Sequence, residues 1–307
     1  MFGGSGFVGR HIASTLLKKG YRLRVAVRRP ELCGHLQTSG VAGQIQFVQA
    51  NLRYPESVEQ AILGSDVVIN SIGLLFEKGS QNFNNIHKHG PGLIANLCTK
   101  NKVKKLIHIS AIGSDATSTS KYARTKAEGE NELLEEKKDS IIIRPSVVYG
   151  PDDNFFNQFA KIISISPLFP LFGGGNTKFQ PIYVADLANA IAKIVEDNKG
   201  KQIFEIGGNE IYSFKEIIEF ISLTIKKKII VLPVPSNISK SIAFFMMLLP
   251  RPLLTPDQVE LLKYDNIVDI ESNNIGRLED LGIVPNSIET IVPSYIERFC
   301  KGGKYNS

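Results

Sequence analysis

The stretch Gly3-Gly4-Ser5-Gly6-Phe7-Val8-Gly9 decides the fold that this sequence predicts. Its glycines match both the Gly-x-x-Gly-x-x-Gly and the Gly-x-Gly-x-x-Gly spacings. A tight turn, a close approach of backbone to a pyrophosphate and close helix–strand packing each require a residue without a Cβ atom. A helix that begins near Phe7 also directs free N–H groups and its positive dipole end toward phosphates. The loop therefore predicts a dinucleotide-binding site, with an ordinary glycine turn as the alternative.

The sequence that follows alternates short apolar runs with helical patterns, which is typical of βαβ units and a parallel sheet. The runs are rich in Val and Ile and lack clean alternation, as expected of strands buried on both faces. The expected strands are Arg22–Val27, Ile45–Gln49, Val67–Ser71, Leu106–Ser110 and Ser140–Arg144. The expected helices are Gly9–Lys19, Pro55–Leu63, Phe83–Lys100 and Tyr122–Lys137. We therefore predict an α/β fold with a doubly wound parallel sheet of the Rossmann type, in the strand order 3-2-1-4-5-6.

The pattern changes after Arg144, where prolines and a run of glycines predict a stretch rich in loops. The helix expected at Val184–Glu196 and the strand expected at Gln202–Ile206 then return to the sheet. We assign residues 1–152 and 181–206 to the dinucleotide-binding domain. A smaller, partly discontinuous C-terminal lobe for substrate or docking is assigned to residues 153–180 and 207–300, and a tail to residues 301–307.

Only Met1 and Phe2 precede the glycine loop, although such a loop normally follows a central strand of about 5–6 residues. Without that strand, its two neighbours present unpaired N–H and C=O groups, each costing about 1–3 kcal/mol when buried. We therefore expect the natural chain to start several residues upstream, with an apolar strand before Phe2. The alternative is a marginal fold with a frayed or substituted central strand.

The composition is that of a globular protein with a sizeable core, since 43% of the residues are hydrophobic and 21% are charged. The cysteines Cys33, Cys98 and Cys300 are far apart, so they indicate neither a disulfide framework nor a zinc site. His87 and His89 do not share a helical face, and no metal is predicted. The cytoplasm or an equivalent reducing compartment is therefore the expected location.

The charge and the apolar runs limit the class of partner. A net charge of +6 permits an anionic ligand or an acidic membrane surface. The absence of Trp and the scattered lysines argue against a nucleic-acid binder that stacks bases. No apolar stretch approaches the roughly 20 residues that span a bilayer. The run Ile242–Leu249, with Lys226–Lys228, Lys240 and Arg251 around it, is interpreted as core, with docking on a membrane surface or partner as the alternative.

Two arginines, Arg28 and Arg29, follow the first predicted strand. A site for NAD(H) normally carries a carboxylate near this position, which binds the ribose 2′-hydroxyl. A guanidinium instead suits a 2′-phosphate, through bidentate charge-assisted hydrogen bonds. NADP(H) is therefore the preferred cofactor and NAD(H) remains possible, with two solvated loop arginines as the plainer interpretation.

These residues resemble the short-chain dehydrogenase/reductase superfamily in its extended branch, the NAD-dependent epimerases and dehydratases. Further stretches carry the same resemblance: Asn51-Leu52, Tyr122-x-x-x-Lys126, Arg144-Pro145-Ser146-Val147-Val148-Tyr149-Gly150-Pro151 and Gln180-Pro181-Ile182-Tyr183-Val184-Ala185-Asp186-Leu187-Ala188. The resemblance covers about residues 1–210. It implies cofactor contacts at Gly3, Ser5, Gly6, Phe7, Val8, Gly9, Arg28, Arg29, Asn51, Leu52, Ser71, Ile72, Gly73, Ser110, Tyr122, Lys126, Pro145 and Val148.

Within the superfamily, the chain is most similar to the family of the nucleotide-binding accessory subunit of respiratory complex I (NADH:ubiquinone oxidoreductase) and its bacterial relatives. The stretches that carry this similarity are Arg24–Pro30, Gln49–Arg53, His108–Ala111 and Leu253–Val259. The similarity implies a tightly held NADPH and a structural, assembly or redox-sensing role near a quinone-linked membrane enzyme. It also implies a respiratory complex as partner, and a location that is peripheral on the inner membrane.

Tyr122 and Lys126 stand four residues apart and share one face of their predicted helix. A nearby ammonium favours the phenolate, which can then exchange a proton while hydride moves at a nicotinamide. The family places a Ser or Thr where this chain has Ala111, so whether the pair is catalytic stays open. An active NAD(P)-dependent reductase, epimerase or dehydratase is the alternative function. The same helix carries glutamates that are interpreted as a solvated face: Glu128, Glu130, Glu132, Glu135 and Glu136.

Overall fold

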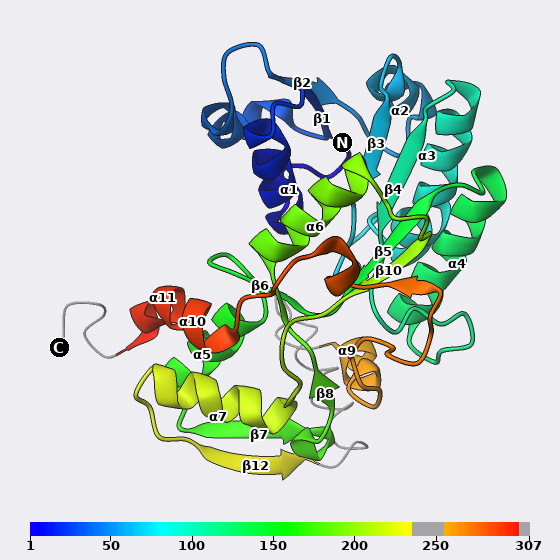
Figure 1. Cartoon of the computed structure of the whole chain (residues 1–307). Coiled ribbons are helices and arrows are strands. Elements are labelled where there is room, and N and C mark those ends of the chain that lie inside the picture. The colour runs from blue at the N-terminus through cyan, green and yellow to red at the C-terminus, as the bar shows by residue number, and fades with distance from the viewer. Residues whose placement is uncertain (235–254, 301–307) are drawn as a thin grey trace. The chain divides into compact units, whose positions relative to one another are not determined.

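The structure is a computed structural model that describes residues 1–234 and 255–300 (Figure 1). The chain divides into two compact units. Unit 1 comprises Met1–Pro145, Val184–Ile206 and Asp269–Ile283. Unit 2 comprises the described residues of Ser146–Tyr183, Gly207–Val268 and Val284–Ser307. Residues 269–283 therefore pack in unit 1, whereas the sequence placed them with the C-terminal lobe.

Unit 1 contains a parallel sheet, which confirms the predicted α/β class. Its strands are β1 (Leu23–Val27), β2 (Ile45–Gln49), β3 (Val67–Asn70), β4 (Lys105–Ile109), β5 (Ile141–Pro145), β10 (Ile203–Ile206) and β13 (Ile275–Gly276). Five of them pair in parallel in the order β13-β10-β5-β4-β3, and β1 pairs in parallel with β2. In β1, β3, β4, β5 and β10 the buried side chains are mostly apolar, because helices cover both faces of this part of the sheet, whereas no residue of β2 is fully buried.

The backbone of Phe2 joins the β1–β2 pair to the other five strands. Phe2 forms parallel bridges with Ala26 in β1 and with Asn70 in β3. Its N–H donates to Ile69 O at 2.8 Å, and its carbonyl accepts from Ser71 N at 3.1 Å. Its side chain is 3% exposed. Phe2 thus holds the central position between the strands numbered second and fourth in the predicted order 3-2-1-4-5-6, and that order is confirmed.

Helices cover the sheet of unit 1 in two layers (Figure 1). The helices α1 (Phe7–Lys18) and α6 (Val184–Glu196) pack against each other, while α2 (Pro55–Ile62), α3 (His89–Lys100) and α4 (Lys121–Glu136) form the other layer. The helix predicted over Phe83–Lys100 is helical throughout, but its first part is wound more widely than an α-helix. Residues Asn84–Lys88 form a π-helical turn, η3, before α3 begins. The turn lies against α4, where the backbones approach closely at Gly129.

A buried ion pair fastens α4 to the sheet. Arg144 in β5 donates from Nη2 to Glu130 Oε2 at 2.6 Å, and its Nη1 lies 3.5 Å from Glu205 Oε1 in β10. Glu130 is only 3% exposed. The interpretation of the α4 glutamates as a solvated face is therefore wrong for Glu130, because this part of the helix faces the Arg144 guanidinium. The ion pair fixes the position of α4 along β5.

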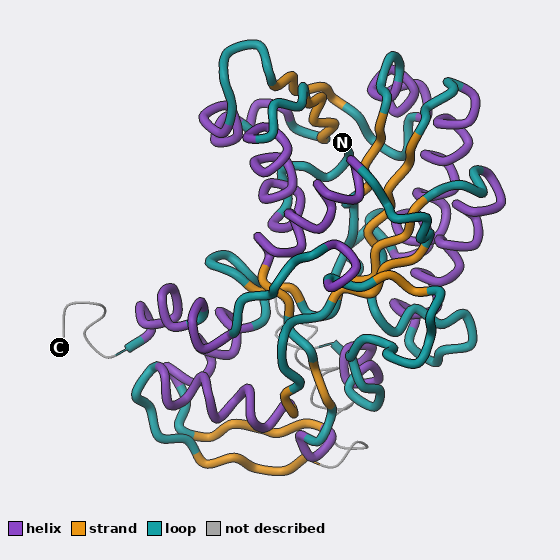
Figure 2. Tube along the Cα trace, viewed as in Figure 1, coloured by secondary structure: helices purple, strands orange, loops and turns teal. Residues whose placement is uncertain are grey.

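Unit 2 consists of short elements, which Figure 2 shows separated by long loops. Its strands form three separate pairs: β6 (Val148–Tyr149) with β9 (Ile182–Tyr183), β7 (Leu168–Phe172) with β12 (Ile230–Val234), and β8 (Lys178–Phe179) with β11 (Tyr212–Ser213). Its helices are α5 (Phe156–Ile165), α7 (Phe214–Thr224), α9 (Pro256–Leu261), α10 (Ile288–Ile291) and α11 (Pro293–Ile296). Aromatic side chains fill the core, among them Phe156, Phe169 and Phe214.

The buried carboxylate of Asp153 ties the loop after β6 to the C-terminal helices of unit 2. It accepts a hydrogen bond from the Tyr295 hydroxyl at 2.7 Å and from the amides of Gly150, Phe155 and Asn157.

In residues 1–234 and 255–300, no helix is long and apolar enough to cross a membrane. The predicted apolar run Ile242–Leu249 lies outside the described residues.

Candidate functional site

The glycine loop makes a tight turn between Phe2 and α1. Gly3 has a φ of +74°, in the left-handed region, and a Cβ there would lie 2.9 Å from the Ser71 carbonyl. A Cβ on Gly9 would lie 2.2 Å from the oxygen of Gly3. The loop closes through a hydrogen bond from Gly6 N to Gly3 O at 3.1 Å. Glycine is therefore required where the loop touches β3 and where α1 packs on the loop.

The first turn of α1 presents backbone donors without a side-chain cap. Gly6 is the N-cap residue and offers no side-chain oxygen, and no acidic residue stands in the first turn. The N–H groups that begin a helix have no intrahelical acceptor, and the positive end of the dipole lies there. Phe7, Val8 and Gly9 supply these groups. This arrangement fits an anionic group such as a pyrophosphate.

The residues that follow β1 and β2 have fewer contacts with the rest of unit 1 than the glycine loop has. Arg28 and Arg29 are both exposed, and no ion pair to either is found among the described side chains. Asn51 follows β2, and its side-chain oxygen accepts from Arg53 N at 3.1 Å. Leu52 is partly buried and contacts the core of unit 1. The arginines are thus free to meet a ligand, whereas Asn51 also serves the turn that leads into α2.

The end of β3 forms the wall beside the glycine loop. The Ser71 hydroxyl donates to Phe2 O at 2.7 Å, and Ile72 N donates to Asn70 Oδ1 at 3.1 Å. The Asn70 amide nitrogen then faces His108 Nδ1 at 3.1 Å, inside the sheet. Gly73 is exposed, and a Cβ on it would lie 3.8 Å from Lys126 Nζ. The backbone after β3 therefore runs from the glycine loop to the lysine of α4.

Tyr122 and Lys126 lie on α4, as predicted. Lys126 is 4% exposed, and its ammonium donates to Ile109 O at the end of β4 at 3.1 Å. Burial lowers the pKa of Lys126 to about 8, with a smaller opposing effect from Glu130. The Tyr122 ring is partly buried and packs edge-on against the ring of Phe83. The helix thus presents a phenol and an ammonium that readily changes charge, which is suitable for proton transfer.

Ser110 and Ala111 follow β4 directly. The Ser110 hydroxyl is buried and lies 3.1 Å from the hydroxyl of Ser114, which donates to Ala111 O at 2.8 Å. Because Ser114 uses its proton on that carbonyl, Ser110 is the donor within the pair. The structure therefore places two hydroxyls next to the position where the resemblance expects one, but on different residues.

His87 also lies among these side chains, although no motif in the sequence indicated it. The ring lies 5.2 Å from that of Tyr122, at an angle of 89°, and its Nε2 accepts from Leu74 N at 2.9 Å. His87 was considered only as a metal ligand, together with His89. Its spacing from Phe83, one helical turn earlier, was the available signal that the two rings share a face. Among the described residues, no group of His, Cys, Asp and Glu is suited to hold a metal ion.

The last two predicted cofactor contacts lie at the change from unit 1 to unit 2. Pro145 ends β5 in unit 1, and its carbonyl accepts from Ile112 N at 3.0 Å. Val148 begins β6 in unit 2, where it pairs with Ile182 in β9. Unit 1 therefore brings together the predicted contacts of the glycine loop, the ends of β3 and β4, and α4.

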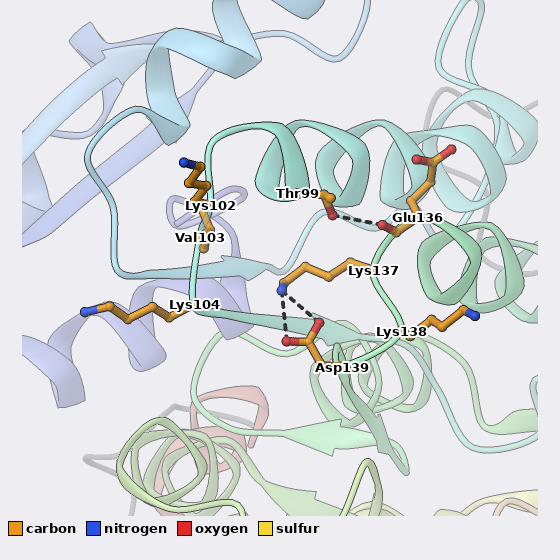
Figure 3. Close-up of a pocket in the computed structure, with 8 residues that line it drawn as sticks. All are labelled: Thr99, Lys102, Val103, Lys104, Glu136, Lys137, Lys138 and Asp139. Carbon is orange, nitrogen blue, oxygen red and sulfur yellow. Dashed lines mark hydrogen bonds and ion pairs between the residues drawn. The ribbon is translucent and has the colours of Figure 1, made fainter.

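A hollow at the amino ends of β4 and β5 is separate from the candidate site, which lies at the carboxyl ends of the strands (Figure 3). It is lined by Thr99, Lys102, Val103, Lys104, Glu136, Lys137, Lys138 and Asp139, where β4 and β5 begin and where α3 and α4 end. Figure 3 shows the Lys137 ammonium turned to the Asp139 carboxylate, 2.8 Å away. Lysines near helix C-termini offset the negative end of the dipole. Ligands of open α/β sheets bind at the carboxyl ends of the strands, so this hollow is not the candidate site.

Comparison with known proteins agrees with this geometry. Residues 1–207 match the pattern of the NAD dependent epimerase/dehydratase family. The chain is 32% identical over 299 residues to the Rattus norvegicus protein named NADH dehydrogenase (ubiquinone) 1 alpha subcomplex subunit 9, mitochondrial, covering 94% of this chain and 77% of that protein. The Arabidopsis thaliana protein of the same name is 29% identical over 316 residues, which cover 99% of this chain and 78% of the plant protein.

A solved structure shows the same fold. A nucleoside-diphosphate-sugar epimerase from Staphylococcus aureus superimposes with a TM-score of 0.72, covering 94% of this chain and 96% of that one. The two sequences are 15% identical, so this likeness concerns the fold alone. Its extent shows that both units of this chain have counterparts in that structure.

Proposed function

Because the chain belongs to the NAD dependent epimerase/dehydratase family, and within it to the family of the rat and plant NADH dehydrogenase (ubiquinone) subunits, we propose that it is a dinucleotide-binding accessory protein. It binds NADP(H) and has a structural, assembly or redox-sensing role near a quinone-linked membrane enzyme. The observation that carries the proposal is the glycine cradle, in which a Cβ on Gly9 would lie 2.2 Å from Gly3 O. Such close packing leaves the amides of the first turn of α1 accessible to a pyrophosphate.

The residues present fit a nicotinamide dinucleotide. The Gly3–Gly9 loop and the start of α1 hold the pyrophosphate, and Asn51 and Leu52 lie toward the adenine. Ser71–Gly73 and Ser110 border the path to α4, where Tyr122 and Lys126 meet the nicotinamide ribose. The remaining contacts proposed from the sequence are Pro145 and Val148. A bound dinucleotide supplies hydride transfer, and the protein supplies the binding and orientation.

The test of dinucleotide binding is to purify the native protein and identify the nucleotide that accompanies it. A tightly held NADPH that does not turn over supports the accessory role. Protein that contains no nucleotide, and that gives no binding signal when NADPH or NADH is added, contradicts the proposal.

The preference for NADP(H) is proposed from Arg28 and Arg29. Both are exposed after β1, where a 2′-phosphate can be reached without breaking an ion pair seen in the structure. Charge-assisted hydrogen bonds contribute about 1.5–3 kcal/mol each. Arg28→Ala/Arg29→Ala should therefore weaken NADPH binding at least tenfold and leave NADH binding unchanged. Arg22→Ala, an exposed arginine just before β1, is the matched control; equal affinity of the wild type for both cofactors contradicts the preference.

The proposed partner is a respiratory complex or the membrane surface beside it, reached through unit 2. One face of the β7–β12 pair exposes apolar side chains: Leu168 is 49%, Ile230 60% and Leu232 46% exposed. The exposed Lys226 and Lys228 precede β12, so an apolar face lies close in sequence to cationic side chains. This supports a peripheral location at an inner membrane in a reducing compartment.

Vesicle co-sedimentation tests the membrane contact. Ile230→Glu/Leu232→Glu should abolish binding to vesicles that contain anionic lipid, and high salt should weaken the binding of the wild type. The control is Val284→Glu, because Val284 is an exposed apolar residue of unit 2 that is not part of the β7–β12 pair. Wild-type protein that stays in the supernatant with anionic vesicles at low salt contradicts membrane docking and leaves a protein partner.

An active enzyme is the second candidate function. It is favoured by one observation, the buried Lys126 ammonium on the same helical face as Tyr122. The pKa of Lys126 is lowered to about 8, and a pKa close to the working pH suits a group that transfers protons. Ala111 argues against it, because it lacks the expected hydroxyl. Conversion of a carbonyl or nucleotide-sugar substrate to product by the protein with its cofactor, lost in Tyr122→Phe, would establish the enzyme.

A further inference from the structure

The His87 ring is held from three directions. Leu74 N donates to its Nε2 at 2.9 Å. The Phe83 ring stacks on it with centroids 5.0 Å apart and planes 17° apart, and the Tyr122 ring meets it edge-on at 5.2 Å. The side chain is 1% exposed. One imidazole therefore contacts the backbone after β3 and the phenol of α4 at the same time.

The hydrogen bond from Leu74 determines the form of the ring. Because Nε2 accepts, the proton of the neutral imidazole is on Nδ1, which is buried and has no partner among the described residues. Burial, and to a smaller extent the charges of Lys126 and His108, lower the pKa of His87 to about 2. The ring thus stays neutral and keeps its acceptor for Leu74 at every physiological pH.

The backbone around His87 is arranged to bring the ring to α4. Asn84–Lys88 form a π-helical turn, a feature that is frequently found at functional sites. On the facing helix, a Cβ on Gly129 would lie 1.8 Å from the His87 carbonyl oxygen. No other residue type permits this approach. The turn and the glycine together fix the height of the His87 ring beside Tyr122.

We propose that His87 is a positioning residue of the dinucleotide site, which holds the Leu74 amide, and with it the backbone of Ser71–Leu74, in register with the Tyr122 phenol. The inference rests on the proposed dinucleotide binding. Ser71–Gly73 approach both the glycine loop and Lys126, since a Cβ on Gly73 would lie 3.8 Å from Lys126 Nζ and 4.0 Å from His87 Nε2. Movement of this segment changes the space left for a ligand between the loop and α4. If His87 served only as core, an apolar ring or chain would replace it equally well.

Two substitutions separate positioning from core packing. In His87→Gln the amide oxygen can replace Nε2 as acceptor for Leu74, whereas His87→Leu fills similar space without an acceptor. We expect His87→Leu to weaken NADPH binding about tenfold, the effect of one lost hydrogen bond of about 1.4 kcal/mol. His87→Gln should stay within about threefold of the wild type. Equal affinity in wild type and His87→Leu, or an equal loss in both variants, overturns the proposal.

Hydrogen exchange of the Leu74 amide gives a readout that does not need the cofactor. The exchange rate is measured in each protein without nucleotide. In His87→Leu the Leu74 amide has lost its acceptor, so it should exchange at least tenfold faster than in the wild type, and His87→Gln should restore the slow rate. An unchanged rate in His87→Leu overturns the proposal.

Gly129→Ala tests the same positioning from α4. The added methyl displaces the His87 carbonyl, so the variant should speed the exchange of the Leu74 amide as His87→Leu does, even though its His87 ring is intact. A Gly129→Ala protein that folds and has the wild-type exchange rate contradicts the proposal. If the wild type binds neither NADPH nor NADH, the proposed function fails, while the Leu74 exchange rates still decide the role of His87.

Discussion

The two sides of the candidate site are built from different material. The side at the glycine loop is made of backbone, since Gly3 and Gly9 are needed for what their missing Cβ atoms allow. The side at α4 is made of buried polar side chains, with Lys126, Glu130 and His87 each less than 5% exposed. A backbone site is specified by a short sequence motif. A side-chain site depends on partners brought together by packing, so it can be altered at many more positions.

The largest effect is expected on the α4 side, from Arg144→Met. The change leaves Glu130 and Glu205 buried without their cation, and breaking a buried pair costs about 3–5 kcal/mol. Urea unfolding measures the loss. Lys104→Met, which breaks the exposed pair with Asp66, should cost less than about 1 kcal/mol. Equal losses in the two variants would show that burial does not distinguish the pairs.

Lys126→Met should stabilise the protein while weakening dinucleotide binding. The unfolded chain keeps the Lys126 proton to about pH 10.5, but in the folded protein its pKa is about 8. The unfolded state binds more protons between these values, so the stability of the wild type rises with pH there and carries the full penalty below pH 8. The penalty corresponds to about 3 kcal/mol, which the variant regains at pH 7.

Unfolding free energies of the wild type and Lys126→Met are compared from pH 7 to pH 10.5. The difference should shrink as the pH rises through this range, and Lys138→Met, at an exposed lysine, should show no such trend. A difference that does not depend on pH contradicts a lowered pKa for Lys126. Unchanged NADPH affinity in Lys126→Met would remove this residue from the site.

Gly9→Ala addresses the backbone side. The new Cβ meets Gly3 O, and overpacking of this kind costs about 1–3 kcal/mol. Because the loop must move to accept the methyl, NADPH binding should be lost even where the fold survives. Gly34→Ala, at a glycine with open space around its Cβ position, is the control for thermal unfolding and binding. Wild-type affinity in Gly9→Ala would show that the cradle does not hold the ligand.

The smallest change in stability is expected for Tyr122→Phe, at most about 1.5 kcal/mol, because the ring contacts with Phe83 and His87 are kept and only the hydroxyl is lost. Cofactor affinity should also be nearly unchanged. Any turnover should fall by about 10²- to 10⁴-fold, the usual contribution of a general acid–base group. Turnover that survives in the variant would place the proton transfer on another residue.

The sequence predicts the backbone side of the site far better than the α4 side. The bounds of β2 (Ile45–Gln49) and α6 (Val184–Glu196) match the prediction because an apolar strand and an amphipathic helix are local patterns. Glu130 was misinterpreted because its partner Arg144 becomes visible only once β5 lies under α4. The π-helical turn at His87 packs closely against Gly129, far along the chain, and no local pattern indicates that contact.

The bridges that Phe2 forms on both sides couple the opening of the backbone hydrogen bonds in the middle of the sheet. The Ala26 amide is bonded to Met1 O and the Ser71 amide to Phe2 O, so both hydrogens exchange with solvent when this one segment opens. The glycine loop continues directly from Phe2, so a ligand bound there raises the free energy of that opening by mass action. Slowed hydrogen exchange at Ala26 and Ser71 thus reports occupancy of the loop. Because Phe2 is the residue that bridges β1 at Ala26 and β3 at Asn70, ligand binding at the loop stabilises the connection between these two strands.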